Sequence, residues 1–128
     1  METLCLAPHC VKVKGWKWLP GMRVRHISTP YRVVFVEEDE YLGETFTILK
    51  AYQEHDSGQG LCMIIVHNET FPDLEDLATG GALFLMLGEK SSLLSRVEDK
   101  WGVVGSEITY GFVGDAAAHL ALSLGAWG

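Results

Sequence analysis

The sequence predicts an α+β fold in which an antiparallel sheet, formed by the first two-thirds of the chain, packs against two helices from the C-terminal half. Segments rich in β-branched and aromatic residues alternate with turn residues in the first two-thirds. An apolar helix is predicted after Asp76 and an alanine-rich helix after Asp115. The chain of 128 residues, 48% of them apolar, is long enough for one core. We therefore expect a single domain over residues 1–128, in which residues 1–10 can form a mobile tail.

The strands are predicted from local residue patterns. Met22–Ile27 and Tyr31–Glu37 are expected to form a hairpin around Ser28–Pro30, because both segments are rich in β-branched and aromatic residues. Thr45–Tyr52 is predicted to be a further strand, with a helix as the alternative. Leu61–Val66 is apolar at every position, which is typical of a strand covered on both faces. We therefore expect Leu61–Val66 in the centre of the sheet.

The first main helix is predicted over Leu77–Leu87. Asp76 stands where a side-chain oxygen can accept a hydrogen bond from the first-turn amides. Because the segment carries no charge, we expect the helix to be buried. Gly80 and Gly81 each cost about 1 kcal/mol relative to alanine within a helix, so they are expected where another element approaches closely.

The remaining segments are assigned in the same way. Ser91–Val97 is predicted to add a helical turn, and Trp101–Val104 is expected to pair with Glu107–Val113 as a second hairpin. Ala116–Leu124 is predicted to form the final helix, which Gly125 is suited to end. The buried stripe of this helix is expected to contain Ala117, Leu120, Ala121 and Leu124.

The order of these segments resembles that of a group of small uncharacterised phage and prophage proteins. The similarity lies in residues 19–24 (LPGMRV), residues 72–79 (PDLEDLAT), a leucine-rich helix, residues 101–104 (WGVV) and an alanine-rich last helix. It leaves most of residues 25–70 unmatched. In that group a proline usually follows the capping Asp and a bulky residue follows the Thr, where this chain has Leu77 and Gly80. The resemblance implies a phage-linked accessory protein without an assigned function.

Charge is distributed unevenly along the chain. Residues 1–36 contain six bases and one acid, a net charge of +5, whereas residues 37–128 contain four bases and sixteen acids, a net charge of −12. The two parts can neutralise each other within one fold or across a dimer contact. They can also form separate surfaces, and each surface then suggests a different partner.

The leading hypothesis is a non-enzymatic protein that binds a host or phage protein through an acidic surface, as an inhibitor could. The candidate surface is the run Glu37, Glu38, Asp39 and Glu40, which is expected to be a solvated turn. Charge complementarity would speed the encounter with a basic partner, including one that normally holds nucleic acid. The alternative is that the acidic residues bind no partner and only keep the protein soluble.

The second hypothesis is nucleic-acid binding by the basic segment. Alternation in an extended chain would place Lys12, Lys14, Trp16 and Trp18 on one side, so that cations and stacking faces interleave. The full candidate set is Lys12, Lys14, Trp16, Lys17, Trp18, Arg23 and Arg25. The alternative is an edge strand whose lysines discourage aggregation and whose tryptophans cover the core.

A third hypothesis is a small enzyme that uses His55, Asp56 or Cys62. Acid–base or nucleophilic catalysis needs two groups within hydrogen-bond reach, and no spacing here requires that. Cys62 and His67 are expected on opposite faces of a strand. Gly58–Gly60 precedes a strand and not a helix, so no phosphate site is predicted. We therefore name no catalytic residue and no cofactor.

Cys5, His9 and Cys10 are candidate metal ligands, with Cys62 or His67 as a conceivable fourth. These residue types suit zinc, but the spacing lacks the short paired clips of tetrahedral sites. No metal site is predicted from it.

A cytoplasmic location is expected, which is the host cytoplasm for a phage-encoded protein. The apolar run Ala82–Leu87 is far shorter than the roughly 20 residues that cross a bilayer. Glu2 stands where a secretory signal has a base, and the three cysteines are an odd number, which favours reduced thiols. Ala82–Leu87 is also the segment where an interface between two copies could extend.

Overall fold

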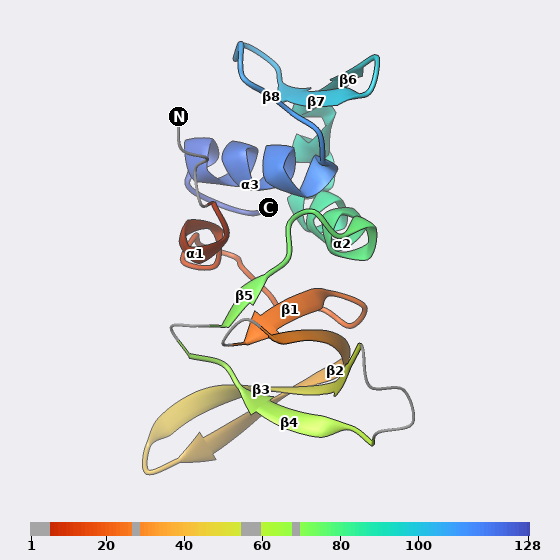
Figure 1. Cartoon of the computed structure of the whole chain (residues 1–128). Helices are drawn as coiled ribbons and strands as arrows, with labels where there is room; N and C mark the ends of the chain where they lie inside the picture. Colours follow the sequence, from red (N-terminus) through yellow and green to blue (C-terminus); the bar gives the residue numbers. More distant parts are fainter. Residues whose placement is uncertain (1–5, 27–28, 55–59, 68–69) are drawn as a thin grey trace. The chain divides into compact units, whose positions relative to one another are not determined.

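The α+β class is confirmed by the structure, a computed structural model that describes residues 6–26, 29–54, 60–67 and 70–128. A five-stranded antiparallel sheet and a three-stranded antiparallel sheet accompany two longer helices in the C-terminal half (Figure 1). Contacts between Cα atoms divide the described residues into two compact units. One unit, residues 18–73, contains the larger sheet. The other, residues 6–17 and 74–128, contains the helices and the smaller sheet.

The larger sheet has the strand order β4-β3-β2-β1-β5. Its strands are β1 (Arg23–His26), β2 (Thr29–Tyr41), β3 (Glu44–Gln53), β4 (Cys62–Ile65) and β5 (Thr70–Pro72), and every neighbouring pair is antiparallel. The predicted first hairpin corresponds to β1 and β2, and the predicted third strand to β3. Both predictions are confirmed.

One face of this sheet forms the core of its unit. Val33 lies opposite Ala51, and Leu49 lies opposite Ile64, and all four side chains are buried. Directly opposed residues of antiparallel strands share a face, so these pairs form a continuous apolar layer. The register of β2 and β3 shifts just after Val33, as at a β-bulge.

β4 lies at the edge of the sheet, so the predicted central position of Leu61–Val66 was wrong. Ile64 is buried, but Leu61, Met63 and Ile65 are each more than half exposed. An apolar run predicts that a segment has hydrophobic neighbours on both sides. It does not specify how many strands of the same chain pair with it.

The β2–β3 hairpin continues beyond the rest of its sheet (Figure 1). β1 pairs with β2 only as far as Arg32, and β4 reaches Ile48 of β3. Farther out, the two arms pair with each other up to Tyr41 and Glu44. The acidic run predicted as a turn lies within β2 instead. The chain reverses beyond it, at Leu42 and the following glycine, which both have positive φ angles.

In the other unit, helix α2 (Leu77–Leu87) begins and ends where the sequence predicts. The Asp76 carboxylate accepts a hydrogen bond of 2.9 Å from the Thr79 backbone N–H, which confirms the predicted cap.

The predicted full burial of α2 was wrong. Leu83 and Leu87 are buried, whereas Leu77 and Leu85 are about four-fifths exposed. The helix is apolar all round, but α3 covers only one of its sides.

Helix α3 (Val113–Leu124) packs against α2. A Cβ atom on Gly80 would lie 2.6 Å from the Val113 side chain, so this glycine permits the close approach that the sequence predicted. The same prediction was wrong for Gly81, where an added Cβ would meet no atom within 4 Å. Ala117, Leu120 and Ala121 are buried as predicted. Leu124 is 44% exposed, against the prediction, because it lies in the last turn before Gly125.

The smaller sheet has the order β6-β7-β8. A 3-10 helix η1 (Gly88–Leu93) leads into β6 (Leu94–Val97), which pairs with β7 (Lys100–Val103) and then β8 (Thr109–Tyr110). The helical turn predicted over residues 91–97 was therefore wrong beyond Leu93, whereas the tryptophan-containing strand is confirmed.

Helix α1 (Ala7–Cys10) lies within the segment predicted as a mobile tail. The Trp127 indole N–H donates a hydrogen bond of 2.9 Å to the Cys10 carbonyl oxygen, and both residues are buried. Burial raises the pKa of the Cys10 thiol to about 12. No described helix has the length and apolar character needed to span a bilayer.

Candidate functional site

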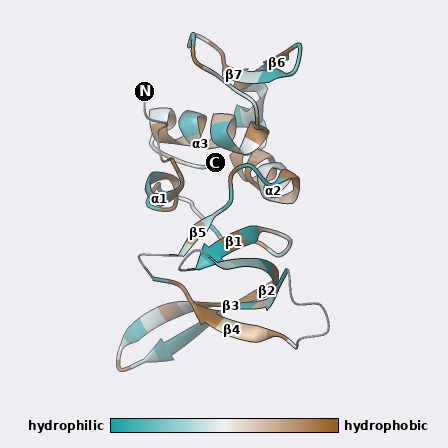
Figure 2. Ribbon diagram, viewed as in Figure 1, coloured by the Kyte–Doolittle hydropathy of each residue, from teal (hydrophilic) through white to brown (hydrophobic). Residues whose placement is uncertain are grey.

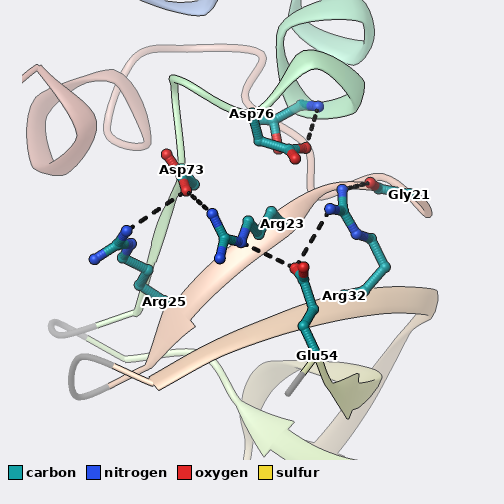
Figure 3. Close-up of polar contacts among 8 residues, drawn as sticks. Gly21, Arg23, Arg25, Arg32, Glu54, Asp73 and Asp76 are labelled. Carbon is teal, nitrogen blue, oxygen red and sulfur yellow. Dashed lines mark hydrogen bonds and ion pairs between the residues drawn. The ribbon is translucent and has the colours of Figure 1, made fainter. Parts of the chain in front are cut away.

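The β2–β3 hairpin has charged side chains at both ends, and its base is held by ion pairs (Figure 3). The Arg23 guanidinium donates to the Glu54 carboxylate at 3.0 Å and to the Asp73 carboxylate at 2.8 Å. Arg32 lies 3.3 Å from the same Glu54 carboxylate and donates to the Gly21 carbonyl oxygen at 2.9 Å. The base is therefore a connected set of charge-assisted hydrogen bonds.

Strand register explains why these charges meet. Arg23 of β1 lies directly opposite Arg32 of β2, and two like charges at that spacing repel each other. Glu54 follows the end of β3 and Asp73 follows the end of β5, so both carboxylates lie beside the arginines. Asp73 also lies 3.7 Å from Arg25, whose side chain is more exposed. Each of the three arginines is thus paired with a carboxylate.

The far end of the same hairpin is acidic. We call residues 37–45 the hairpin tip. Its carboxylates belong to Glu37, Glu38, Asp39, Glu40 and Glu44, and all five residues are exposed. Within the described residues, one cation lies in ion-pair range of this cluster: Lys50, whose ammonium is 3.9 Å from Glu37. Such an exposed pair is worth little, so the tip keeps a strong local negative charge.

The two faces of the tip both carry carboxylates. Side chains of a strand point alternately to opposite faces, so Glu37 and Asp39 lie on one face and Glu38 and Glu40 on the other. Figure 2 shows the hydrophilic colouring of this part of β2. A partner can therefore meet negative charge whichever face of the ribbon it approaches.

The turn at the tip exposes apolar side chains. Tyr41 is 67% exposed and Leu42 is 85% exposed. Leu42 has a φ of 53°, a left-handed conformation that non-glycine residues rarely adopt. Backbone strain of this kind is concentrated at functional sites. An exposed tyrosine and leucine amid carboxylates are suited to anchor a contact that the charges attract.

The basic segment does not form the predicted extended surface. Consecutive turns follow α1, in which the N–H of Lys12 donates to His9 and that of Val13 to Cys10. The Trp16 ring packs on Trp127 at 5.5 Å between centroids.

The seven predicted nucleic-acid residues are divided between the two units. Lys12, Lys14, Trp16 and Lys17 belong to the helical unit. Trp18 in the sheet unit is buried, and Arg23 and Arg25 there are ion-paired. Trp16 and Trp18 thus pack against other residues, and Arg23 and Arg25 pair with a carboxylate. Nucleic-acid binding by this set stays a prediction.

A shallow depression of about 520 Å³ lies in the helical unit. Two ammonium groups, those of Lys14 and Lys17, stand beside it. Its full lining consists of Lys14, Gly15, Lys17, Leu85, Met86, Ala126, Trp127 and Gly128. Because Trp127 is almost fully buried, the depression offers no aromatic face on which a base could stack.

One of the three candidate catalytic residues, Cys62, lies among the described residues. His55 and Asp56 lie outside the described residues. Cys62 is exposed on β4, and its thiol donates to the Ala51 carbonyl oxygen at 3.3 Å.

The candidate zinc ligands do not form a metal site within the described residues. Cys5 lies outside the described residues, His9 is exposed, and burial of Cys10 disfavours the thiolate that zinc requires. His67 is exposed, with its ring 4.6 Å from that of His26. Across the described ranges, no three His, Cys, Asp or Glu side chains gather as a metal-ligand set.

Sequence reasoning missed the ion-paired base and the strained turn. The available signal for part of the base was that Glu54 follows the predicted strand Thr45–Tyr52, next to a predicted hairpin that contains three arginines. The signal for the turn was Leu42 before Gly43, between an acidic run and a β-branched run.

No protein-family model, curated protein or solved structure matches this chain. The relationship to phage proteins therefore stays a prediction, and the function has to be inferred from the geometry of the site.

Proposed function

We propose that this protein is a non-enzymatic binding protein that docks its hairpin tip on a basic surface of another protein. One observation carries the proposal: five exposed carboxylates stand on a ribbon that continues past its sheet, with one described cation, Lys50, in ion-pair range. The other described cations of the same sheet are paired at its base.

The tip would act in two steps. Its uncompensated carboxylates attract a basic surface over about one Debye length, roughly 8 Å at physiological ionic strength. Tyr41 and Leu42 then come into contact with the partner, because they lie at the end of the ribbon and are largely exposed. Charge supplies the encounter rate and the orientation, and the apolar side chains supply much of the affinity.

The partner class is a host or phage protein with a lysine- or arginine-rich surface. A surface that normally holds nucleic acid fits this description, since the carboxylates would take the place of phosphates. The resemblance of the chain to phage accessory proteins supports this class, and inhibition of such a partner would follow from occupancy of its basic surface.

The test compares two variants of equal net charge. The tip variant neutralises four carboxylates through Glu37→Gln, Glu38→Gln, Asp39→Asn and Glu40→Gln. The control variant neutralises four exposed carboxylates of the helical unit through Glu89→Gln, Glu98→Gln, Asp99→Asn and Glu107→Gln. Both change the formal net charge from −7 to −3. Each is immobilised and incubated with cell lysate beside the natural chain, and captured proteins are quantified by mass spectrometry.

We expect the natural chain and the control variant to capture the same basic protein, and the tip variant to lose at least ten-fold of it. Circular dichroism melting of all three proteins verifies that the fold is retained. Equal capture by the tip variant would show that the carboxylates of the hairpin tip do not bind the captured protein. Equal loss in both variants would show that net charge, and not this surface, determines binding.

A further inference from the structure

β4 is a short edge strand of four residues that has no charged residue, proline or register shift to protect it. Natural edge strands carry charges, proline or bulges that prevent pairing with another chain. Residues 61–66 contain no charged residue and no proline. Figure 2 shows the hydrophobic colouring of β4. Such an edge is a ready template for one more strand.

The free edge has a defined pattern of backbone groups. The N–H of Val66 donates to the Thr47 carbonyl oxygen, so Thr47 and Val66 are a hydrogen-bonded pair next to β4. Such pairs alternate along an antiparallel ladder, so Ile64 directs its backbone groups towards β3. Met63 and Ile65 consequently direct theirs away from the sheet.

The side chains of the same two residues are also available. Met63 is 59% exposed and Ile65 is 51% exposed, and both lie on the face of the sheet opposite to the buried Ile64. One strand added to this edge would therefore satisfy the backbone groups of Met63 and Ile65 and cover part of their side chains at the same time.

We propose that a second copy of this chain supplies that strand, with two β4 strands pairing antiparallel around a two-fold axis at Ile64. In this register Met63 lies opposite Ile65 of the second copy, and Ile65 lies opposite Met63 of the second copy. Directly opposed residues share a face, so the exposed apolar side chains meet in two equivalent pairs. The result is one continuous sheet of ten strands.

Charge favours a second copy as the occupant. The edge itself is uncharged, so it does not attract a basic protein, which would bind more strongly to the carboxylates of the hairpin tip. The antiparallel arrangement also sends the two tips in opposite directions. From Leu49, which pairs with Ile64, to Glu44 is about 17 Å of strand, so the two Glu44 residues are roughly 34 Å apart along the sheet. At roughly four Debye lengths, their mutual repulsion is screened.

The pairing also gives β4 the position that its sequence predicts. A fully apolar run is typical of a strand with neighbours on both sides. β4 has one such neighbour within its own chain and acquires the second from the other copy.

The first test measures mass by sedimentation equilibrium of the full chain. We expect twice 14.2 kDa for the natural chain and 14.2 kDa for Met63→Lys, because the lysine would face an apolar side chain of the second copy. Leu85→Lys changes an apolar residue of α2 that is 78% exposed, against 59% for Met63, and should stay dimeric. The tip variant described above should also stay dimeric, which separates this proposal from the proposed function. A monomeric natural chain, or a dimer that tolerates Met63→Lys, would overturn the proposal.

The second test addresses the register. The two-fold at Ile64 places position 66 opposite Cys62 of the second copy, in a non-hydrogen-bonded pair with Cα atoms about 4.5 Å apart, which permits a disulfide. Val66→Cys should therefore cross-link spontaneously into a dimer on a non-reducing gel, whereas Cys62→Ser combined with Val66→Cys should not. Absence of the cross-link in a dimeric Val66→Cys protein would exclude this register, and an unchanged cross-link in the double variant would exclude the predicted thiol pair.

Discussion

The two ends of strand β2 carry opposite charges and meet opposite surroundings. At the base, Arg32 shares Glu54 with Arg23, and these side chains are three-quarters or more buried. At the tip, Glu37 to Glu40 are exposed, and Lys50 is the one described cation in ion-pair range. The arginines of residues 23–32 thus become part of an ion-pair network, whereas the acids of residues 37–40 form an open charged surface.

The difference shows that charge along a sequence does not specify charge on a surface. The arginines lie on the neighbouring strands β1 and β2, and carboxylates follow the ends of β3 and β5, so the arginines are neutralised locally. The acidic run starts opposite Ile48, where β4 ends, and continues to where β2 and β3 pair only with each other, so few other groups can reach it. We therefore expect substitutions at the base to change stability and substitutions at the tip to change binding.

The largest effect on stability is expected from Arg23→Ala. The change removes two charge-assisted hydrogen bonds and leaves the carboxylates of Glu54 and Asp73 partly buried without this partner. Since the site retains some solvent access, we expect the free energy of unfolding to fall by about 2 kcal/mol, less than for a fully buried pair. Urea denaturation measures it. Arg25→Ala is the matched control and should cost about 0.5 kcal/mol or less, because its pair is long and exposed. Equal costs for both changes would contradict the ranking.

An intermediate effect of opposite sign is expected from Leu42→Asn. Asparagine adopts the left-handed conformation more readily than leucine and, before Gly43, forms a favoured two-residue turn. The free energy of unfolding should rise by about 1 kcal/mol. Binding of the partner should weaken, because the exposed leucine is lost. A variant that is both more stable and equally active in binding would show that the strained leucine has no role in contact.

The smallest effect on stability is expected from the tip carboxylates. Glu38→Gln and Glu40→Gln remove charges that have no described ion pair, so the free energy of unfolding should change by less than about 0.5 kcal/mol. Thermal denaturation at low and physiological salt measures this. A loss comparable with that of Arg23→Ala would mean that the tip contributes to the fold and would remove the contrast between the two ends.

The sequence predicted the elements whose signals are local. Asp76 caps α2 because a carboxylate before an apolar helix binds first-turn amides, whatever surrounds it. Gly80 was likewise interpreted correctly as a close-approach residue. The acidic run of the candidate site was also identified, although it was assigned to a turn and not to a strand.

The features that depend on distant pairing were not predictable from local patterns. Arg23 contacts Glu54 and Asp73, which are 31 and 50 positions away in the sequence. The periodicity of neighbouring residues does not indicate contacts over such separations. The edge position of β4 depends on how many strands the chain supplies, and the exposure of Leu85 depends on how much of α2 its neighbours cover. Leu42 is strained because the hairpin register requires a left-handed residue there.

The most direct test of the central claim is the salt dependence of affinity for a captured basic partner, measured for the natural chain and for the two four-site variants of equal net charge. The location of the carboxylates, and not their number, should determine binding. The natural chain and the control variant should therefore bind with the same affinity and the same decrease with salt, and the tip variant should bind weakly with a much shallower decrease. Identical salt dependence for the two variants would contradict the account.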